Sequence, residues 1–84
     1  MGKKKDSLYK VNVGVYHKSN TGAIRKRVED IQNVTGLSCR IDNNKTLQNY
    51  YSIYIDKLFD KDVALCIVTL LKMSRYLSYM EEVR

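Results

Sequence analysis

The residues that could contact a ligand lie at every second position of two segments, YKVNVGVY (9–16) and YYSIYID (50–56). On one parity these segments carry Lys10, Asn12, Gly14, Tyr16, Ser52 and Tyr54. Amide, hydroxyl, ammonium and phenol groups on one flat surface suit a sugar chain, which offers hydroxyls and apolar ring faces. They also suit single-stranded nucleic acid, whose bases stack on aromatic rings while cations contact the phosphates.

The alternation predicts that both segments are strands with one buried face. The buried parity consists of Tyr9, Val11, Val13, Val15, Tyr51, Ile53 and Ile55. Between the strands, residues 22–34 repeat apolar side chains at helical spacing, with Ile24, Val28 and Ile31 on one face. A cap from Ser19, Asn20 or Thr21 is expected to begin this helix, and Gly36 is expected to end it in a left-handed conformation.

The remaining segments complete a β-α-β-β-α-β order. Residues 37–42 alternate as a second strand, and residues 43–49 are typical of a turn. Asp60 is expected to cap a helix from residue 61 to about 72, which is apolar around most of its circumference and should be the more buried helix. The weak alternation of residues 76–83 favours a final strand. This order predicts an α+β, ferredoxin-like fold with a four-stranded antiparallel sheet and both helices on one face.

In such a sheet the first and third strands are the central pair, so their outward residues share one patch. Arg40 and Ser38 of the second strand are expected to flank the patch, with Tyr50 at its rim. The plain alternative is a face that is only solvated, because antiparallel sheets often leave one face in water.

Composition limits the class of protein. The chain has 84 residues and a net charge of +6, which indicates one small domain (8–84) behind a basic flexible tail (1–7). The charge favours anionic partners such as nucleic acid, an acidic membrane surface or wall polymer, or it simply keeps the domain soluble. No apolar run reaches the roughly 20 residues that span a bilayer, so no membrane insertion is expected. No apolar region of a secretory signal follows the basic start.

No group of residues is typical of catalysis or of metal binding. His17 is the single histidine and lies in a predicted turn, and no carboxylate pair is spaced to face a substrate from two sides. Cys39 and Cys66 do not have the spacing of a zinc motif and are expected to be buried thiols, with a disulfide between them left open. The sequence therefore predicts a binding module without an enzymatic activity, cofactor or metal.

The two strands together resemble the SPOR family, bacterial domains that bind peptidoglycan and have a Y-x-V-Q-V-G-x-F type first strand. The matching residues are Tyr9, Val11, Val13 and Gly14. Asn12 stands for the family's glutamine, and Tyr16 for its aromatic residue. YSIYIDKLFDKDVA resembles the second motif, with Asp56 in place of a glycine, and Gly36 matches the glycine that ends the first helix. The resemblance spans roughly residues 8–83.

The resemblance implies that the open sheet face binds glycan strands stripped of their stem peptides, through Asn12, Val15 and Tyr50. Together with the patch, the candidate ligand-binding residues are Lys10, Asn12, Val15, Tyr16, Arg40, Tyr50, Ser52 and Tyr54. SPOR domains are usually attached to wall hydrolases or division proteins. The expected location is therefore the cell envelope if the chain is part of such a protein, and the cytoplasm if it is a small separate or phage-encoded protein.

Two other classes of function stay open. An RRM-like domain shares the β-α-β-β-α-β order and would stack bases on Tyr16 and Tyr54, with Lys10 and Arg40 on phosphates. The third strand, however, lacks the glycine of the RNP1 pattern. A small phage or regulatory protein could instead dock on another protein through the same face.

Overall fold

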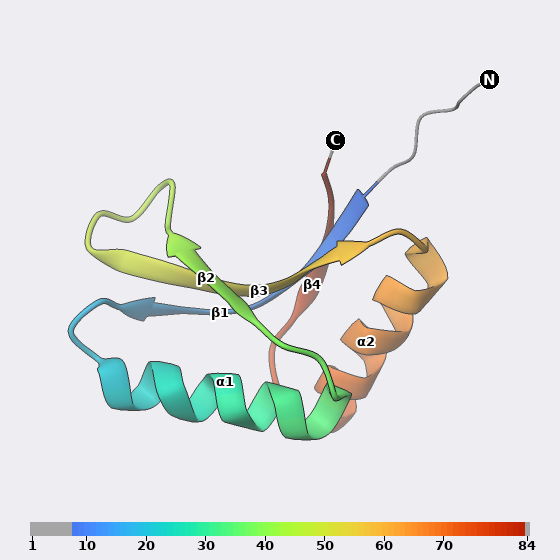
Figure 1. The fold of residues 1–84 in the computed structure, drawn as a ribbon, viewed down its shortest axis with the longest axis horizontal. Helices are drawn as coiled ribbons and strands as arrows, with labels where there is room; N and C mark the ends of the chain where they lie inside the picture. The colour runs from blue at the N-terminus through green and yellow to red at the C-terminus, as the bar shows by residue number, and fades with distance from the viewer. Residues whose placement is uncertain (1–7, 84) are drawn as a thin grey trace.

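The computed structural model describes residues 8–83, so the predicted tail (1–7) lies outside the described residues. Figure 1 shows the predicted order of elements, with the sheet above α1 and beside α2. The elements are β1 (Leu8–His17), α1 (Thr21–Thr35), β2 (Arg40–Asn43), β3 (Tyr50–Leu58), α2 (Lys61–Met73) and β4 (Tyr79–Val83). The sheet order is β2-β3-β1-β4 and every pair is antiparallel, so the predicted α+β fold with β1 and β3 at the centre is confirmed.

Both helices pack on the same face of the sheet. The core consists of Val11, Val13, Ile24, Ile31, Ile53, Ile55, Ala64, Ile67, Val68 and Leu71. Ile31, Ile53 and Leu71 are among the fully buried side chains, and they come from α1, β3 and α2. The helical and alternating patterns of the sequence therefore meet in one cluster, because each presents its apolar side to the same layer.

The ends of the helices differ in how they are capped. At α2, Asp60 accepts a hydrogen bond from the backbone N–H of Asp62 at 2.8 Å, as predicted. At α1, Asn20 occupies the N-cap position, but its side chain makes no capping hydrogen bond. Gly36 ends α1 with a φ of 75°, the left-handed conformation expected from the sequence.

The strand β1 contains a β-bulge that the alternating sequence does not reveal. Asn12 pairs with Tyr54 and Gly14 pairs with Ile53, so Val13 is an extra residue on β1. Val13 remains buried, and beyond it the two parities exchange faces. A second irregularity lies near the other end of the pair, where β3 has the extra residue and Lys57 has a φ of 61°.

Two expectations about strand length and burial are wrong. The second strand is short, since only residues 40–43 pair with β3, and Leu37 and Cys39 pack on the core from the preceding loop. Cys66 is exposed on α2 instead of buried, and both cysteines are free. The expectation that α2 is the more buried helix is confirmed, since it contributes four buried side chains and α1 contributes two. Its outer side is apolar as well, yet nothing among the described residues covers that side.

Candidate functional site

The side of the sheet away from the helices is called the open face below. Taken from the strand registers, it carries Lys10, Asn12, Val15, Arg40, Asp42, Tyr50, Ser52, Tyr54, Tyr79 and Glu81. Seven of the eight residues predicted from the sequence are therefore brought to one surface: Lys10, Asn12, Val15, Arg40, Tyr50, Ser52 and Tyr54. The pairing of β4 with β1 adds Tyr79 beside Asn12 and Glu81 beside Lys10, which sequence reasoning missed.

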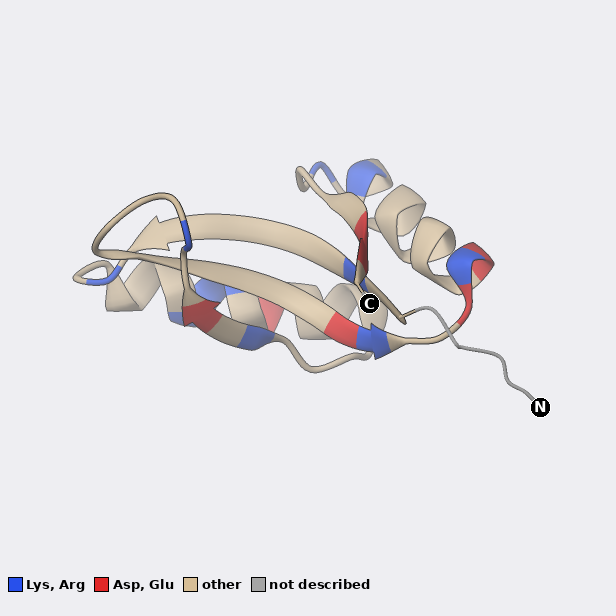
Figure 2. Ribbon diagram, turned by 90° about the horizontal axis from the view of Figure 1, so that it is seen from above, with Lys and Arg blue, Asp and Glu red and all other residues tan. Residues whose placement is uncertain are grey.

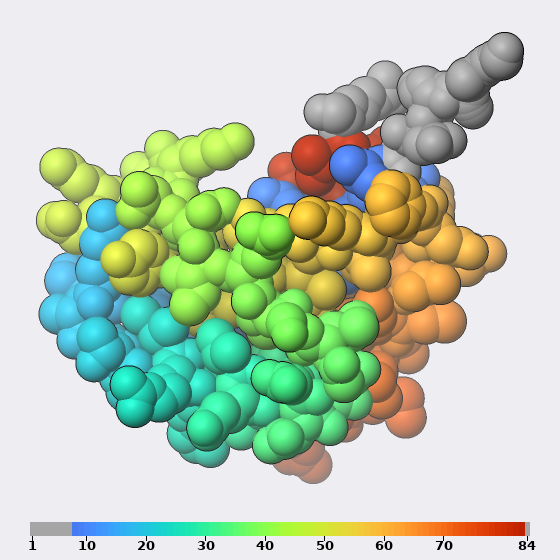
Figure 3. Space-filling model, viewed as in Figure 1, coloured from blue at the N-terminus to red at the C-terminus, as the bar shows by residue number. Residues whose placement is uncertain are grey.

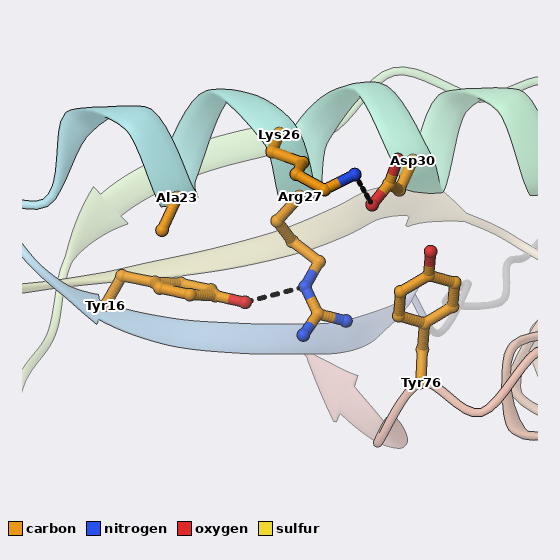
Figure 4. Close-up of a pocket in the computed structure, with 6 residues that line it drawn as sticks. All are labelled: Tyr16, Ala23, Lys26, Arg27, Asp30 and Tyr76. Atoms are coloured by element: carbon orange, nitrogen blue, oxygen red, sulfur yellow. Dashed lines mark hydrogen bonds and ion pairs between the residues drawn. The ribbon is translucent and has the colours of Figure 1, made fainter.

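Tyr16 is the exception, and its predicted place on the open face is wrong. It follows the bulge, so it turns towards α1 and packs on the core, while Val15 turns out and is 47% exposed. Figure 4 shows the Tyr16 hydroxyl directed at Arg27, whose Nε donates to it at 2.7 Å. The Arg27 guanidinium lies over the rings of Tyr16 and Tyr76, with its central carbon 5.7 Å and 4.7 Å from their centroids.

Gly14 makes this position of Tyr16 possible. A Cβ built on Gly14 would lie 2.8 Å from Cε1 of the Tyr16 ring, closer than side chains pack. The glycine of the motif therefore lets the aromatic residue two positions later fold back over the strand. Gly14 thus leaves room for the Tyr16 ring on the helix side of the sheet, next to the bulge that turns Val15 to the open face.

One half of the open face is a network of paired charges. The Lys10 ammonium lies 3.8 Å from Glu81 and 4.7 Å from the centroid of the Tyr54 ring. Glu81 also accepts a hydrogen bond from the Asn12 amide nitrogen at 3.1 Å. Arg40 pairs with Asp56 at 3.0 Å. In Figure 2 blue and red segments lie near each other on β2 and at the end of β3, while β4 is red only.

The Tyr54 hydroxyl donates a short hydrogen bond to the Asp42 carboxylate across the β2–β3 pair. This bond, with partial burial and the negative charges of Asp42 and Asp56, raises the pKa of Tyr54 to about 12. The pKa is raised because only the neutral phenol can donate this bond, which ties β2 to β3 on the open face.

The other half of the open face is hollowed into a groove. This groove, called the sheet groove below, has a volume of about 450 Å³ and is lined by Asn12, Gly14, Val15, Asn44, Ser52, Lys72, Leu77, Ser78 and Tyr79. Val15 of β1 and Ser52 of β3 are paired neighbours. They lie between the two side walls of the groove. Tyr79 is 63% exposed on one wall.

The opposite wall is built by the loop between β2 and β3, which Figure 3 shows in yellow-green standing out from the body of the molecule. The Asn44 amide nitrogen donates to the Ser52 hydroxyl at 2.8 Å, while its oxygen accepts from the backbone N–H groups of Thr46 and Leu47 at 2.9 and 2.7 Å. These bonds hold the loop at the edge of the sheet groove. Asn44 lies in a segment that the sequence indicates only as a turn.

Tyr50 lies at the end of the open face, as the sequence predicted for the rim. Its ring makes an edge contact with His17, with 5.1 Å between the centroids. His17 also contacts Ser19, Nδ1 to Oγ at 2.8 Å, so it takes part in the turn before α1. No three His, Cys, Asp or Glu side chains among residues 8–83 gather as a metal site would require.

The comparisons with known proteins bear on the fold. No protein-family profile and no curated protein matches the sequence. Among solved structures, the chain is similar to the peptidoglycan binding domain of the cell wall lytic enzyme CwlC of B. subtilis. The TM-score is 0.69 at 16% sequence identity, and the match covers 100% of this chain and 99% of that chain. The two domains therefore share their fold over their whole length.

Proposed function

We propose that the protein is a non-catalytic binding module for the glycan strands of peptidoglycan, and that it is a divergent relative of the SPOR domains. The fold shared with a peptidoglycan binding domain supports this proposal. So do the two strand motifs, in which Asn12 stands at the position of the family's glutamine. The proposed location is the cell envelope, where such strands occur. Within the part of the chain that the structure describes, no helix is long and apolar enough to cross a membrane.

The observation that carries the proposal is the chemistry of the sheet groove. Its lining combines the side chains of Val15 and Leu77 with the amides of Asn12 and Asn44 and the ring of Tyr79. A sugar chain needs this combination, because each ring presents hydroxyls at its edge and C–H groups on its face. In the proposed complex a sugar ring stacks on Tyr79.

The hydrogen bonds of the proposed complex come from both walls. The Asn12 oxygen accepts from a sugar hydroxyl, while its nitrogen stays bound to Glu81 at 3.1 Å. The Ser52 hydroxyl, which already accepts from Asn44, donates to the ligand. A wall bounds the groove on each side, and stem peptides attached to the glycan would meet these walls. We therefore propose that the preferred ligand is glycan that has lost its stem peptides.

The pairing of the cations argues against nucleic acid as the ligand. Lys10 and Arg40 are already paired with Glu81 and Asp56, and these acids would repel phosphates. Tyr16 is turned away from the open face, so it cannot form the second stacking platform of an RRM-like site. A neutral ligand such as a sugar chain does not require these ion pairs to break.

Co-sedimentation with insoluble peptidoglycan tests the proposal. Native sacculi and sacculi treated with an amidase are compared at low and moderate salt, with single-stranded RNA as competitor. We expect retention on the treated material, with little dependence on salt and no effect of RNA. Release by salt together with binding to RNA would overturn the proposal in favour of nucleic acid, because phosphate contacts weaken steeply with salt. Absence of binding to both sacculi would also overturn it.

The residues are tested with a matched pair of substitutions. Asn12→Ala should weaken retention about tenfold or more, since a lost hydrogen bond to the ligand costs about 1–3 kcal/mol. Asn33→Ala, the same change on the exposed side of α1, should leave retention unchanged. Equal retention of the Asn12→Ala and Asn33→Ala variants, both folded, would show that the sheet groove is not the glycan site.

A further inference from the structure

The outer side of α2 exposes a continuous strip of apolar side chains. A shallow trough of about 510 Å³ runs along it, lined by Asp62, Leu65, Cys66, Thr69, Leu70 and Met73. Leu65, Leu70 and Met73 are 42%, 41% and 77% exposed. In Figure 3 the helix (orange) forms one border of the molecule, and no other described segment lies outside it. Since the opposite side of α2 is buried in the core, the middle of the helix is apolar on both sides but covered on one side only.

The strip has the symmetry that a pairing of two copies requires. At about 100° per residue, the lining residues fall on one side of the helix. Between Cys66 and Thr69 lies a midpoint about which Leu65 and Leu70 are equivalent positions. An antiparallel pair of α2 helices crossing at this midpoint places Leu65 of each copy against Leu70 of the other. A two-fold interface needs such a self-complementary surface.

The charges of α2 are arranged for the same pairing. Figure 2 shows charged residues only at the two ends of the helix, with the middle uncharged. Asp62 lies in the first turn and Lys72 in the last, and neither forms an ion pair with another residue of the described chain. By the same midpoint Asp62 lies level with Met73 of the other copy, one residue from Lys72, so an antiparallel pair brings ends of opposite charge together. A parallel pair would bring like charges together.

We propose that α2 is a self-association surface through which two copies of this chain pair antiparallel. The helix has 13 residues and is therefore about 20 Å long. A single helix pair buries less than the roughly 1,600 Å² of a standard interface, so monomer and dimer should exchange at micromolar concentrations. The sheet groove reaches the last turn of α2, because Lys72 is one of its lining residues. If the proposed function holds, the dimer therefore carries one glycan groove beside each end of the helix pair.

Sedimentation velocity without any ligand tests the pairing independently of glycan binding. Under reducing conditions the wild type should shift from monomer to dimer as its concentration rises from low micromolar to submillimolar. Leu65→Glu should weaken the dimer at least tenfold. Leu47→Glu, the same change at a residue that is 47% exposed in the loop before β3, should have no effect. A wild type that remains monomeric throughout, or an equal effect of both variants, overturns the proposal.

Exchanging the charges identifies the antiparallel geometry. Asp62→Lys and Lys72→Asp should each weaken self-association about tenfold, because both ends of the pair then bring like charges together. An equal mixture of the two single variants should form a heterodimer, since both ends become attractive again. Failure of the mixture to associate more strongly than either variant alone overturns the pairing, provided that circular dichroism shows both variants folded.

Cysteine cross-linking supplies a second readout at the centre of the strip. A short bifunctional maleimide should link two Cys39→Ser chains through Cys66, and Leu65→Glu should abolish the product. The Cys66→Ser chain keeps only Cys39, which is half-buried away from α2, and should give no product. Equal cross-linking of both single-cysteine chains would mean random collision and would contradict the proposal.

Discussion

The open face and the outer side of α2 are the two exposed surfaces of this domain on which function can be argued, and they are built from opposite chemistry. On the open face the charged groups are mutually paired, as in Lys10 with Glu81 and Arg40 with Asp56, and the groove beside them mixes amides with aromatic and aliphatic groups. On α2 the centre is aliphatic, and the charges of Asp62 and Lys72 at the two ends are without partners in the described chain.

This difference indicates what each surface is suited to bind. Paired charges leave the open face nearly neutral towards a ligand, so its affinity must come from hydrogen bonds and ring stacking, as sugars provide. Within the described chain, the strip on α2 instead has an unpaired negative charge at one end and an unpaired positive charge at the other. It favours an apolar partner with the opposite order of charges, and a second copy turned antiparallel has that order. The net charge of +6 therefore says little about either surface.

The largest expected effect comes from breaking the core that both surfaces share. Val13 is 1% exposed and Val15 is 47% exposed, two positions apart on the same strand. Val13→Asp buries an unpaired charge and should cost about 4 kcal/mol or more, enough to unfold a domain of marginal stability and abolish both binding activities.

Val15→Asp is the matched control. Because this side chain lies on the open face, the free energy of unfolding should change by less than about 1 kcal/mol, while retention on glycan is lost and dimerisation is retained. Urea denaturation followed by circular dichroism measures both variants. Similar losses of stability in the two would show that β1 alternates without a bulge.

The second prediction concerns Gly14, which leaves room for the Tyr16 ring. Gly14→Ala forces the Tyr16 ring away from its place beneath the strand, and overpacking of this kind costs about 1–3 kcal/mol. Gly22→Ala, in the first turn of α1, meets nothing within 4 Å and should be neutral or stabilise by up to about 1 kcal/mol. Thermal denaturation compares the two; the same sign of change in both would argue against a role for Gly14 in placing Tyr16.

The third prediction is a pH dependence within the paired half of the open face. The pKa of Tyr54 is raised from 10.0 to about 12, first by its hydrogen bond to Asp42, so the fold favours the neutral phenol. This contribution to stability is complete below pH 10 and is lost as the pH rises towards about 12. Absorbance at alkaline pH should show one tyrosine ionising late, and Asp42→Asn should bring it back towards the others.

The smallest effect is a difference between the two thiols. Burial raises the pKa of Cys39, whereas Cys66 is exposed on the α2 strip. A thiol-specific reagent should therefore modify Cys66 first at neutral pH, and modification should slow as the protein concentration rises and dimers cover the strip. Single-cysteine variants assign the two phases. Faster reaction of Cys39 would reverse the assignment of the exposed side of α2.

The sequence by itself determined most of the fold. Apolar residues recur at every second position in residues 9–16 and 50–56, and at helical spacing in residues 22–34. Few arrangements of strands and helices can bury all of them together. The β-α-β-β-α-β order then required β1 and β3 to be central, which brought Asn12, Ser52 and Tyr54 together as predicted. Asp60 and Gly36 correctly predicted a helix start and a helix end, because capping depends on the conformation of a few neighbouring residues.

Only the tertiary structure decided which residues of β1 lie on the open face and which side of α2 is left uncovered. The bulge at Val13 exchanges the places of Val15 and Tyr16, and strict alternation cannot reveal an extra residue because its cause lies in the pairing with β3. Asn44 and Tyr79 enter the groove through contacts between strands distant in sequence. Cys66 lies in an apolar run and yet is exposed, because a single thin layer of helices leaves one side of α2 uncovered.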